Sequence, residues 1–578
     1  MTATRSLFPF LRPYRRWVIA APLLMLLEVV MDLMQPRLVQ TIIDSGVAKG
    51  DLQEVFRTGG LMVALALIGA FGGMACTVYA IKAAQYFGAD VRSTLFRKVQ
   101  SLSFSNLDQL ETGKLVTRLT NDVTQVQELV GMALRMLVRA PLLLVGSVVM
   151  AVLTSAKLSL LFVALIPLIL LIMALIFRRA FPMFSRVQAQ LDRINVRMQE
   201  SLAGVRVIRA FARAPYEIGR FAGVNDDLVS ANLAAVRFGA IVMPLMMLVM
   251  NAAAVAVLWF GGHQVNDGKL EVGQLVAFSN YLMQSLMSLM MFSMLVMRIS
   301  RAEASSERID EVLRTEPTIV NAPQPVDAMS GPGRIEFQHV SFRYPGAEVD
   351  AIHDVSFTIE PGKRLAIIGS TGSGKSTLVQ LLPRFYDATE GCILIDGVDV
   401  RQVDHQVLHT YVSVALQEAV LFSGTIRDNI RYGKPDASEF EVVRAATIAQ
   451  AAEFIGKLPD GYDALVGQRG VNLSGGQKQR LSIARAILPQ PAVLVLDDST
   501  SAVDTATEAR ILGALDDLNQ TRIVVAQRIT TVMGADWIVV LDGGRVVGQG
   551  THEDLLATCE MYREIYASQM EVMLDGAA

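Results

Sequence analysis

The sequence predicts a polytopic α-helical membrane domain followed by a separate α/β domain. The 578 residues are 52% hydrophobic and 19% charged, with a mean hydropathy of +0.40, which is too apolar for an ordinary soluble protein. Most of this apolar character lies in the first half, whereas the second half alternates short β-rich runs with helical stretches. The net charge of −3 gives no reason to expect a nucleic-acid partner.

Six apolar segments account for the membrane domain, and each can supply the ~20 residues that a helix needs to cross a bilayer. They lie near residues 17–43, 59–87, 129–153, 158–177, 238–262 and 273–297. The first segment is too long for the apolar core of a signal peptide, so we expect it to be retained as a membrane helix. The lipid bilayer is therefore the first expected partner of this chain.

The connections between these segments alternate in length and charge. The long ones, rich in Lys and Arg, are the N-terminus, 88–128 and 178–237, whereas the other three are short and carry few cations. Because cytoplasmic loops carry an excess of Lys and Arg, we expect a multi-pass protein of the cell membrane with both termini in the cytoplasm. Periodic apolar residues in the long loops predict that the membrane helices continue into the cytoplasm.

A change in composition marks the end of the membrane domain, which we place at residues 1–314. Residues 315–333 are rich in Pro and Gly and are expected to form a linker. Residues 334–578 then form the α/β domain, because short β-rich runs recur between helical stretches. These runs are 334–342, 364–368, 392–395, 493–496, 523–526 and 537–541.

The first functional motif of the α/β domain is a phosphate-binding loop. An apolar strand at 364–368 is followed by the pattern G-x-x-x-x-G-K-[ST] and then by a helical run from Thr377, which is the context that this motif requires. Its residues are Gly369, Ser370, Thr371, Gly372, Ser373, Gly374, Lys375 and Ser376. The backbone N–H groups surround phosphate oxygens, while Lys375 reaches the β/γ phosphates and Ser376 binds Mg²⁺. The expected ligands are ATP and Mg²⁺.

A second strand, at 493–496, ends in Asp497, which is expected to hold the nucleotide-bound Mg²⁺. A third element precedes the helical run 478–487, where a hydroxyl and glycine N–H groups at a helix start suit a γ-phosphate. It consists of Leu473, Ser474, Gly475, Gly476 and Gln477. With this L-S-G-G-Q sequence the chain resembles the ATP-binding cassette (ABC) superfamily. Over nearly its whole length it looks like a half-transporter of the exporter type.

The resemblance implies roles for further residues. Tyr344 matches the aromatic residue that stacks on adenine, although a strand aromatic packed in the core remains an alternative. Gln417 matches a glutamine that senses Mg²⁺, and Asp504 belongs to a loop that crosses the dimer interface. Segments 118–127 and 211–221 match the helices that couple the cassette to the membrane domain.

Two positions depart from the family pattern. Asp498 stands where the family has a Glu that orients the attacking water, and Gln527 stands where it has a His. A carboxylate one methylene short is misplaced for catalysis, and Gln cannot become an imidazolium. The chain therefore resembles the degenerate-site subunit of bacterial heterodimeric multidrug exporters. Its intact Ser474 motif would complete the ATP site of a second half-transporter that carries the Glu and the His.

Two other functions stay open: a homodimeric exporter that hydrolyses ATP through Asp498, and a regulatory subunit for which ATP is a structural clamp. The expected substrate is an amphipathic drug, lipid or peptide. Glu28 and Asp32 share one face of the first membrane helix, where they either bind a cationic substrate or pair with a nearby cation. Methionines at helical spacing in the sixth helix either pack or line an adaptable cavity; they include Met287, Met290 and Met294.

Overall fold

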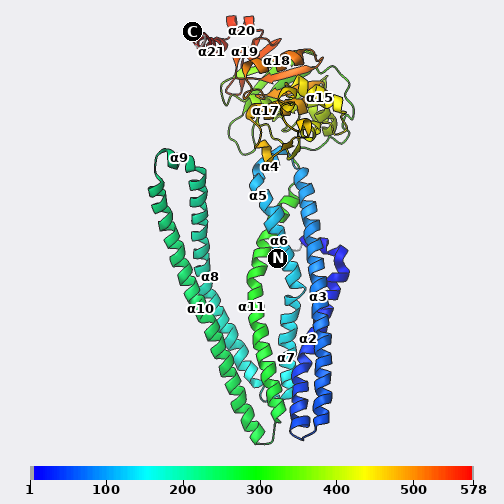
Figure 1. Ribbon diagram of the computed structural model, residues 1–578, viewed down its shortest axis with the longest axis vertical. Coiled ribbons are helices and arrows are strands. Elements are labelled where there is room, and N and C mark those ends of the chain that lie inside the picture. The colour runs from blue at the N-terminus through cyan, green and yellow to red at the C-terminus, as the bar shows by residue number, and fades with distance from the viewer. Residues whose placement is uncertain (1–5, 576–578) are drawn as a thin grey trace. The chain divides into compact units, whose positions relative to one another are not determined.

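A computed structural model describes residues 6–575, apart from the side chains of residues 292–297, 300 and 571–575. The chain divides into two compact units (Figure 1). The membrane unit consists of the chain up to Gln100 together with Gly113–Arg314. The cassette unit consists of Ser101–Thr112 together with the chain from Thr315 onward.

Helices are the secondary structure of the membrane unit in its described residues, and four of them have between 43 and 53 residues. At 1.5 Å per residue these helices are longer than a bilayer is thick, which confirms that helical structure continues beyond the apolar segments. Its elements are η1 (Phe8–Tyr14), α2 (Arg15–Thr41), η2 (Ile42–Val47), α3 (Leu52–Gln100), α5 (Thr112–Thr117), η3 (Arg118–Asp122), α6 (Val123–Ala133), α7 (Met136–Thr154), α8 (Leu160–Ala203), α9 (Val205–Ala210), α10 (Ala214–Asn266) and α11 (Val272–Arg314).

Five helical stretches of the described chain are long and apolar enough to cross a membrane. They are Phe8–Val47, Leu52–Gln100, Thr112–Thr154, Leu160–Ala203 and Ala214–Asn266. The sixth predicted segment, 273–297, lies within α11, but part of it falls outside the described side chains. The prediction of a polytopic helical domain is confirmed, whereas the count of six spans stays a prediction.

The segment 118–127 packs against α11 within the membrane unit. Arg118 and Asp122 are buried and pair with α11: Arg118 Nη2 lies 2.7 Å from Glu311 Oε2, and Arg308 Nε donates to Asp122 Oδ2 at 2.8 Å. Two of its polar side chains are thus engaged by a neighbouring helix, and its coupling to the cassette stays a prediction. The other predicted coupling segment, 211–221, spans the connection from α9 to α10 and exposes Phe211.

A short helix, α4 (Phe104–Leu110), belongs to the cassette unit and packs on it. The ring of Phe104 stacks on Phe385 with centroids 4.6 Å apart, and the Tyr386 hydroxyl donates to Asp108 at 2.7 Å. A capping box from Ser103 begins this helix. The helix α4 was not among the elements expected from the sequence, because a seven-residue helix carries too little periodicity to be recognised.

Two sheets form the frame of the cassette unit. A four-stranded antiparallel sheet has the order β2-β1-β4-β5, and a six-stranded sheet has the order β12-β11-β3-β10-β9-β6. The strands are β1 (Ile335–Phe342), β2 (Ile352–Ile359), β3 (Arg364–Gly369), β4 (Glu390–Ile395), β5 (Val398–Asp399), β6 (Val412–Ala415), β9 (Val493–Asp497), β10 (Thr521–Val525), β11 (Trp537–Asp542) and β12 (Arg545–Gly550), with a separate pair β7 (Gly424–Thr425) and β8 (Leu465–Val466).

The helices of the cassette unit follow these strands in the alternating pattern of an α/β domain. They are α12 (Lys375–Leu381), α13 (His405–Tyr411), α14 (Ile426–Arg431), α15 (Glu439–Ile448), α16 (Ala452–Ile455), α17 (Gly475–Ile487), α18 (Thr505–Asp516), α19 (Ile529–Val532), α20 (His552–Thr558) and α21 (Glu560–Asp575), with single turns at Val400–Gln402, Gly461–Asp463 and Gln468–Gly470. Apolar side chains from both sheets and these helices form two buried clusters.

The register of the parallel strands decides where the functional loops meet. Val525 at the end of β10 pairs with Asp497 of β9 on one side and with Ile367 of β3 on the other. The carboxyl ends of all three strands therefore lie at the same edge of the sheet. In open α/β sheets this edge is where ligands bind.

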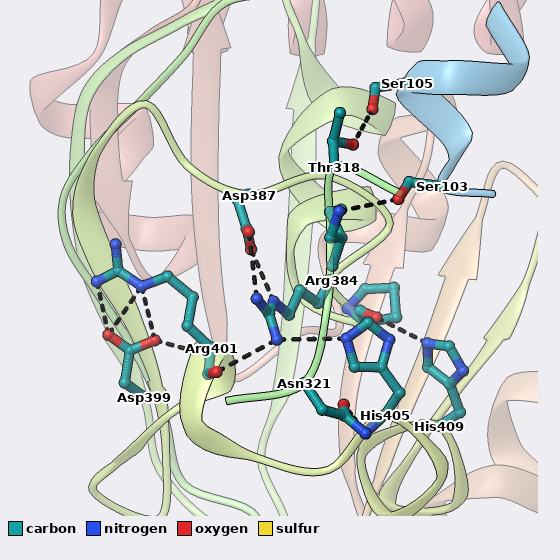
Figure 2. A network of polar contacts seen from close by, with 12 residues as sticks. Ser103, Ser105, Thr318, Asn321, Arg384, Asp387, Asp399, Arg401, His405 and His409 are labelled. Carbon is teal, nitrogen blue, oxygen red and sulfur yellow. Dashed lines mark hydrogen bonds and ion pairs between the residues drawn. The ribbon is translucent and has the colours of Figure 1, made fainter. Parts of the chain in front are cut away.

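A polar network next to α4 holds the linker against the cassette (Figure 2). Buried Arg384 donates two hydrogen bonds to Asp387, at 2.8 and 3.2 Å, and one to His405 Nε2 at 3.3 Å. Because a guanidinium only donates, His405 is neutral here, with its Nε2 as acceptor. Ser105 of α4 and Thr318 of the linker share a hydrogen bond of 2.5 Å.

This network predicts an acid-sensitive cassette. Burial, followed by the charges of Arg384 and His409, lowers the pKa of His405 below its usual range. The unfolded chain therefore binds this proton more readily, so stability falls as the pH drops below the unfolded value of about 6.5 and is unaffected well above it. In thermal melts of the purified protein between pH 7.5 and 5.5, His405→Gln should reduce the acid-dependent loss. The same substitution at exposed His339 is the control, and an equal effect of both would contradict this assignment.

Candidate nucleotide site

The phosphate loop connects β3 to α12 and needs glycine at defined positions. Gly374 has φ = 96°, and a Cβ atom there would lie 2.7 Å from the Ala351 carbonyl oxygen. A residue with a side chain would be strained in this conformation and would collide with the neighbouring backbone. Lys375 folds back over the loop, and its Nζ donates to the carbonyl oxygens of Gly369 at 3.0 Å and Ser370 at 2.7 Å.

The loop is joined directly to the end of β9. Ser376 Oγ donates to Asp497 Oδ1 at 2.8 Å, and Asp497 is only 1% exposed. Burial raises the pKa of Asp497 and lowers that of Lys375, because both charged forms lose water. A hydroxyl and a carboxylate oxygen are the ligand types that Mg²⁺ prefers, so these residues fit the cation that a bound ATP would bring.

Asp498 lies immediately beyond the strand with φ = 46° and is 7% exposed. Its Oδ2 accepts two hydrogen bonds from amide groups, one from Gln417 Nε2 at 3.1 Å and one from Gln527 Nε2 at 2.8 Å. Burial raises the pKa of Asp498, while both amide contacts act in the opposite direction. Three residues from separate parts of the sequence are thus brought together at one carboxylate oxygen.

Tyr344 lies beside the phosphate loop, where its hydroxyl and Thr377 Oγ1 are 3.1 Å apart. Its ring is half-buried and meets Phe342 and Tyr386 edge-on, with centroids 4.9 and 5.4 Å apart. The structure therefore packs part of this residue against the core while placing it next to the loop. Stacking on adenine stays a prediction.

The signature residues form the start of α17. Ser474 and Gln477 make a reciprocal capping box, in which Ser474 N donates to Gln477 Oε1 at 2.9 Å, and both Ser474 and Gly475 are exposed. A Cβ atom on Gly476 would lie 2.8 Å from the Ala502 carbonyl oxygen, so the D-loop (residues 501–504) requires glycine here. Asp504 caps α18 by accepting from Thr507 N at 2.8 Å.

Gln479 is a residue of this region that sequence analysis missed. It is buried on α17, donates to Ser501 Oγ at 3.0 Å and accepts from Ala502 N at 2.8 Å. Ser501 Oγ in turn donates to the Asp498 carbonyl oxygen at 2.9 Å. The signature helix and the Asp498 backbone are thus connected through the D-loop. A single Gln beside the signature gives no sequence signal for such a contact, because glutamine is usually a surface residue.

In the membrane unit, Glu28 and Asp32 are both paired with Arg139 of α7. One guanidinium nitrogen contacts Glu28 Oε1, and Arg139 Nη2 lies 2.9 Å from Asp32 Oδ2. This arrangement favours the structural alternative for the two acids over a site for a cationic substrate, because their negative charges already have a cationic partner.

A cavity of about 480 Å³ lies elsewhere in the membrane unit, between α3, α6, α7 and α11. Its walls include Gln85, Glu128, Arg135 and Met132. Among the described side chains, the predicted cavity residues Glu28, Asp32, Met287 and Met290 do not line it. Met287 is exposed on α11, and the side chain of Met294 lies outside the described residues.

Comparison with known proteins agrees with this architecture. Residues 18–289 match the ABC transporter transmembrane region, and residues 352–501 match the ABC transporter nucleotide-binding family. An uncharacterized ABC transporter ATP-binding protein of Bacillus subtilis is 43% identical over 560 residues, covering 97% of each chain. A fatty acid ABC transporter ATP-binding/permease protein of Mycobacterium bovis is 37% identical over 478 residues, covering 82% of this chain and 75% of the relative.

A solved structure of a bacterial Atm1-family ABC exporter with ATP bound superimposes with a TM-score of 0.80 at 28% identity, covering 96% of this chain and 98% of the exporter. The chain is a membrane-embedded transport ATPase with its membrane and nucleotide-binding domains in one polypeptide. It belongs to the ABC transporter family, as a half-transporter of the exporter type that acts as a dimer in a membrane.

The Arg139 cluster leads to a prediction about stability. Arg139→Met would leave two carboxylates without this cation among membrane helices, and because all three side chains are only partly buried the cost should be below the roughly 3–5 kcal/mol of a fully buried ion pair. We expect a lower melting temperature and a lower yield of folded protein in detergent. The triple variant Glu28→Gln, Asp32→Asn, Arg139→Met should recover most of this loss, because no charge is left unpaired. Equal instability of the single and triple variants would show that Arg139 acts through packing instead.

Proposed function

We propose that this chain is the degenerate-site subunit of a heterodimeric ATP-driven exporter. It binds ATP firmly and hydrolyses it slowly at its own site. The observation that carries the proposal is the environment of Asp498, whose Oδ2 accepts from Gln417 and Gln527 at 3.1 and 2.8 Å. Neither amide can take up or release a proton near neutral pH.

The chemistry of hydrolysis explains why this environment is unfavourable. A general base must lie within hydrogen-bond reach of the attacking water and must attract its proton. Asp498 is one methylene shorter than the glutamate that the family pattern has here, and two N–H donors already stabilise one of its oxygens. A misplacement of ~1 Å can lower a rate ~100-fold, so a shortened carboxylate is expected to orient water poorly.

Unlike Asp498 and Gln527, the residues proposed to bind nucleotide match the family pattern. The backbone N–H groups of the phosphate loop and Lys375 would hold the phosphates, and Tyr344 would stack on the base. Ser376, Gln417 and Asp497 would hold Mg²⁺, which neutralises phosphate charge when bound. ATP binding without rapid hydrolysis would keep the two cassettes closed around the nucleotide.

The exposed signature of this chain would contribute to the ATP site of its partner. In the family, each ATP lies between the phosphate loop of one cassette and the signature of the other, so Ser474 would serve the ATP of the partner. The partner is then a second half-transporter with a catalytic Glu and His. Two alternatives predict different behaviour: a homodimer that hydrolyses through Asp498, or a regulatory subunit with no transport of its own.

The proposal extends to the substrate class and the location of the protein. We propose an amphipathic drug, lipid or peptide as substrate, and one relative is named for fatty acids. The cavity in the membrane unit combines methionine and charged side chains, which suits a molecule with apolar and polar parts. Lys- and Arg-rich loops support a cell-membrane protein with cytoplasmic termini.

The proposal is tested by restoring the site. In the complex with the half-transporter that co-purifies with this chain, the double variant Asp498→Glu, Gln527→His should raise ATP turnover about 10- to 100-fold at the site of this chain. Turnover is measured as phosphate release, together with the ATP concentration at half-maximal rate. Asp517→Glu lengthens an exposed carboxylate by the same methylene and should change neither quantity.

The chain purified by itself supplies the decisive comparison. Weak ATPase activity with retained ATP binding is expected. Rapid, transport-coupled hydrolysis by the chain as a homodimer would overturn the degenerate-site proposal. ATP binding in the complex without uptake of any amphipathic probe into inside-out vesicles would favour the regulatory alternative.

A further inference from the structure

A single side chain of the C-terminal helix α21 contacts the backbone next to Gln527. Gln569 Nε2 donates to the Gln527 carbonyl oxygen at 2.9 Å, and Gln569 Oε1 accepts from Ile529 N at 2.8 Å. The two bonds lie on either side of Arg528, so one side-chain amide fixes both peptide groups of this short segment. We call residues 526–529 the switch loop.

Gln527 connects this contact to the Asp498 carboxylate, on which the proposed function rests. While the backbone of Gln527 is held by Gln569, its side-chain Nε2 donates to Asp498 Oδ2 at 2.8 Å. We propose that Gln569 is a positioning residue of the nucleotide site, through which α21 sets the placement of Gln527 against Asp498. The inference extends the proposed function, because it assigns a source of control to the same site.

Local structure explains why the switch loop needs an external support. The helix that follows, α19, has only four residues, so it fixes the loop weakly by itself. Ile529 is fully buried at its start, and an unpaired N–H group there would be costly. Gln569 satisfies that donor and leaves the Gln527 side chain free to turn toward Asp498.

The other support of the loop acts on a different residue. Arg528 Nη1 donates to buried Glu508 at 2.6 Å and to the Val503 carbonyl oxygen at 3.0 Å. These bonds tie the loop to the D-loop, whereas Gln569 ties it to α21. The switch loop is therefore held by two elements, and α21 is the one outside the recognised motifs.

The start of α21 is well anchored, which makes Gln569 an effective support. Tyr562 is fully buried, and its hydroxyl and His552 Nδ1 lie 2.7 Å apart. Gln569 follows seven residues later on the same helix, which corresponds to about two turns and hence to the same face. A shift of α21 would thus be transmitted to the backbone of Gln527.

Hydrogen–deuterium exchange tests the contact without relying on activity. In the full-length protein in detergent micelles, Gln569→Ala should speed exchange in peptides covering residues 525–533 about fivefold or more, because Ile529 N loses its acceptor. Gln569→Glu keeps that acceptor and should protect Ile529 while removing the donor to Gln527. Ser568→Ala, on the exposed side of α21, is the matched control and should leave exchange unchanged. Unchanged exchange in Gln569→Ala would overturn the proposal.

Kinetics then separate positioning from general stability. In the Asp498→Glu, Gln527→His background, Gln569→Ala should lower kcat about three- to tenfold while the KM for ATP changes less than twofold. In a Gln527→Ala background the same substitution should have no further effect, because there is no side chain left to place. An equal loss in both backgrounds would assign Gln569 a merely structural role and overturn the proposal. If the double variant Asp498→Glu, Gln527→His fails to raise turnover, the degenerate-site proposal is wrong, whereas exchange still decides the role of Gln569.

Discussion

The nucleotide site depends on β10 lying between β3 and β9. This order places three strand ends at one edge, so the phosphate loop, Asp497 and the switch loop converge, although Ser376 of the phosphate loop and Asp497 are 121 residues apart in sequence. The hydrogen bond from Ser376 to Asp497 is the direct result. Because β3, β9 and β10 are buried in a parallel part of the sheet, their register cannot slip without exposing the core. The packing of these strands therefore fixes where the reactive groups lie.

Asp498 follows directly after β9, where the sheet ends and the functional loops begin. Its left-handed backbone conformation is one that Asp adopts more readily than most residues, and one of its two carboxylate oxygens accepts hydrogen bonds from two glutamine amides. The same residue contacts the D-loop through its carbonyl group. The signature helix is thus connected to the backbone of Asp498 through Gln479 and Ser501, whereas the switch loop contacts its carboxylate through Gln527.

Polar residues that looked functional in isolation divide into two groups once their partners are known. Glu28, Asp32, Arg118 and Asp122 are engaged in ion pairs between helices of the membrane unit. Burying charges within a helical bundle requires such pairing, so these residues specify which helices lie side by side. Gln417 and Gln527 instead converge on one carboxylate at the sheet edge. The first group thus pairs with opposite charges on neighbouring helices, whereas the two glutamines contact the carboxylate of the nucleotide site.

Sequence by itself determined the membrane class, the helices that extend past the bilayer, the α/β cassette and the residues of the phosphate loop and signature. Those features are encoded locally, by long apolar runs, by glycine spacing and by strand-to-helix context. Only the tertiary structure decided that residues 118–127 pack on α11, that α4 packs on the cassette, that Arg139 neutralises two acids, and that Gln479 and Gln569 hold the loops around Asp498. Each of these contacts joins residues far apart in the chain, and which side chains meet depends on how the helices and strands pack rather than on any local pattern.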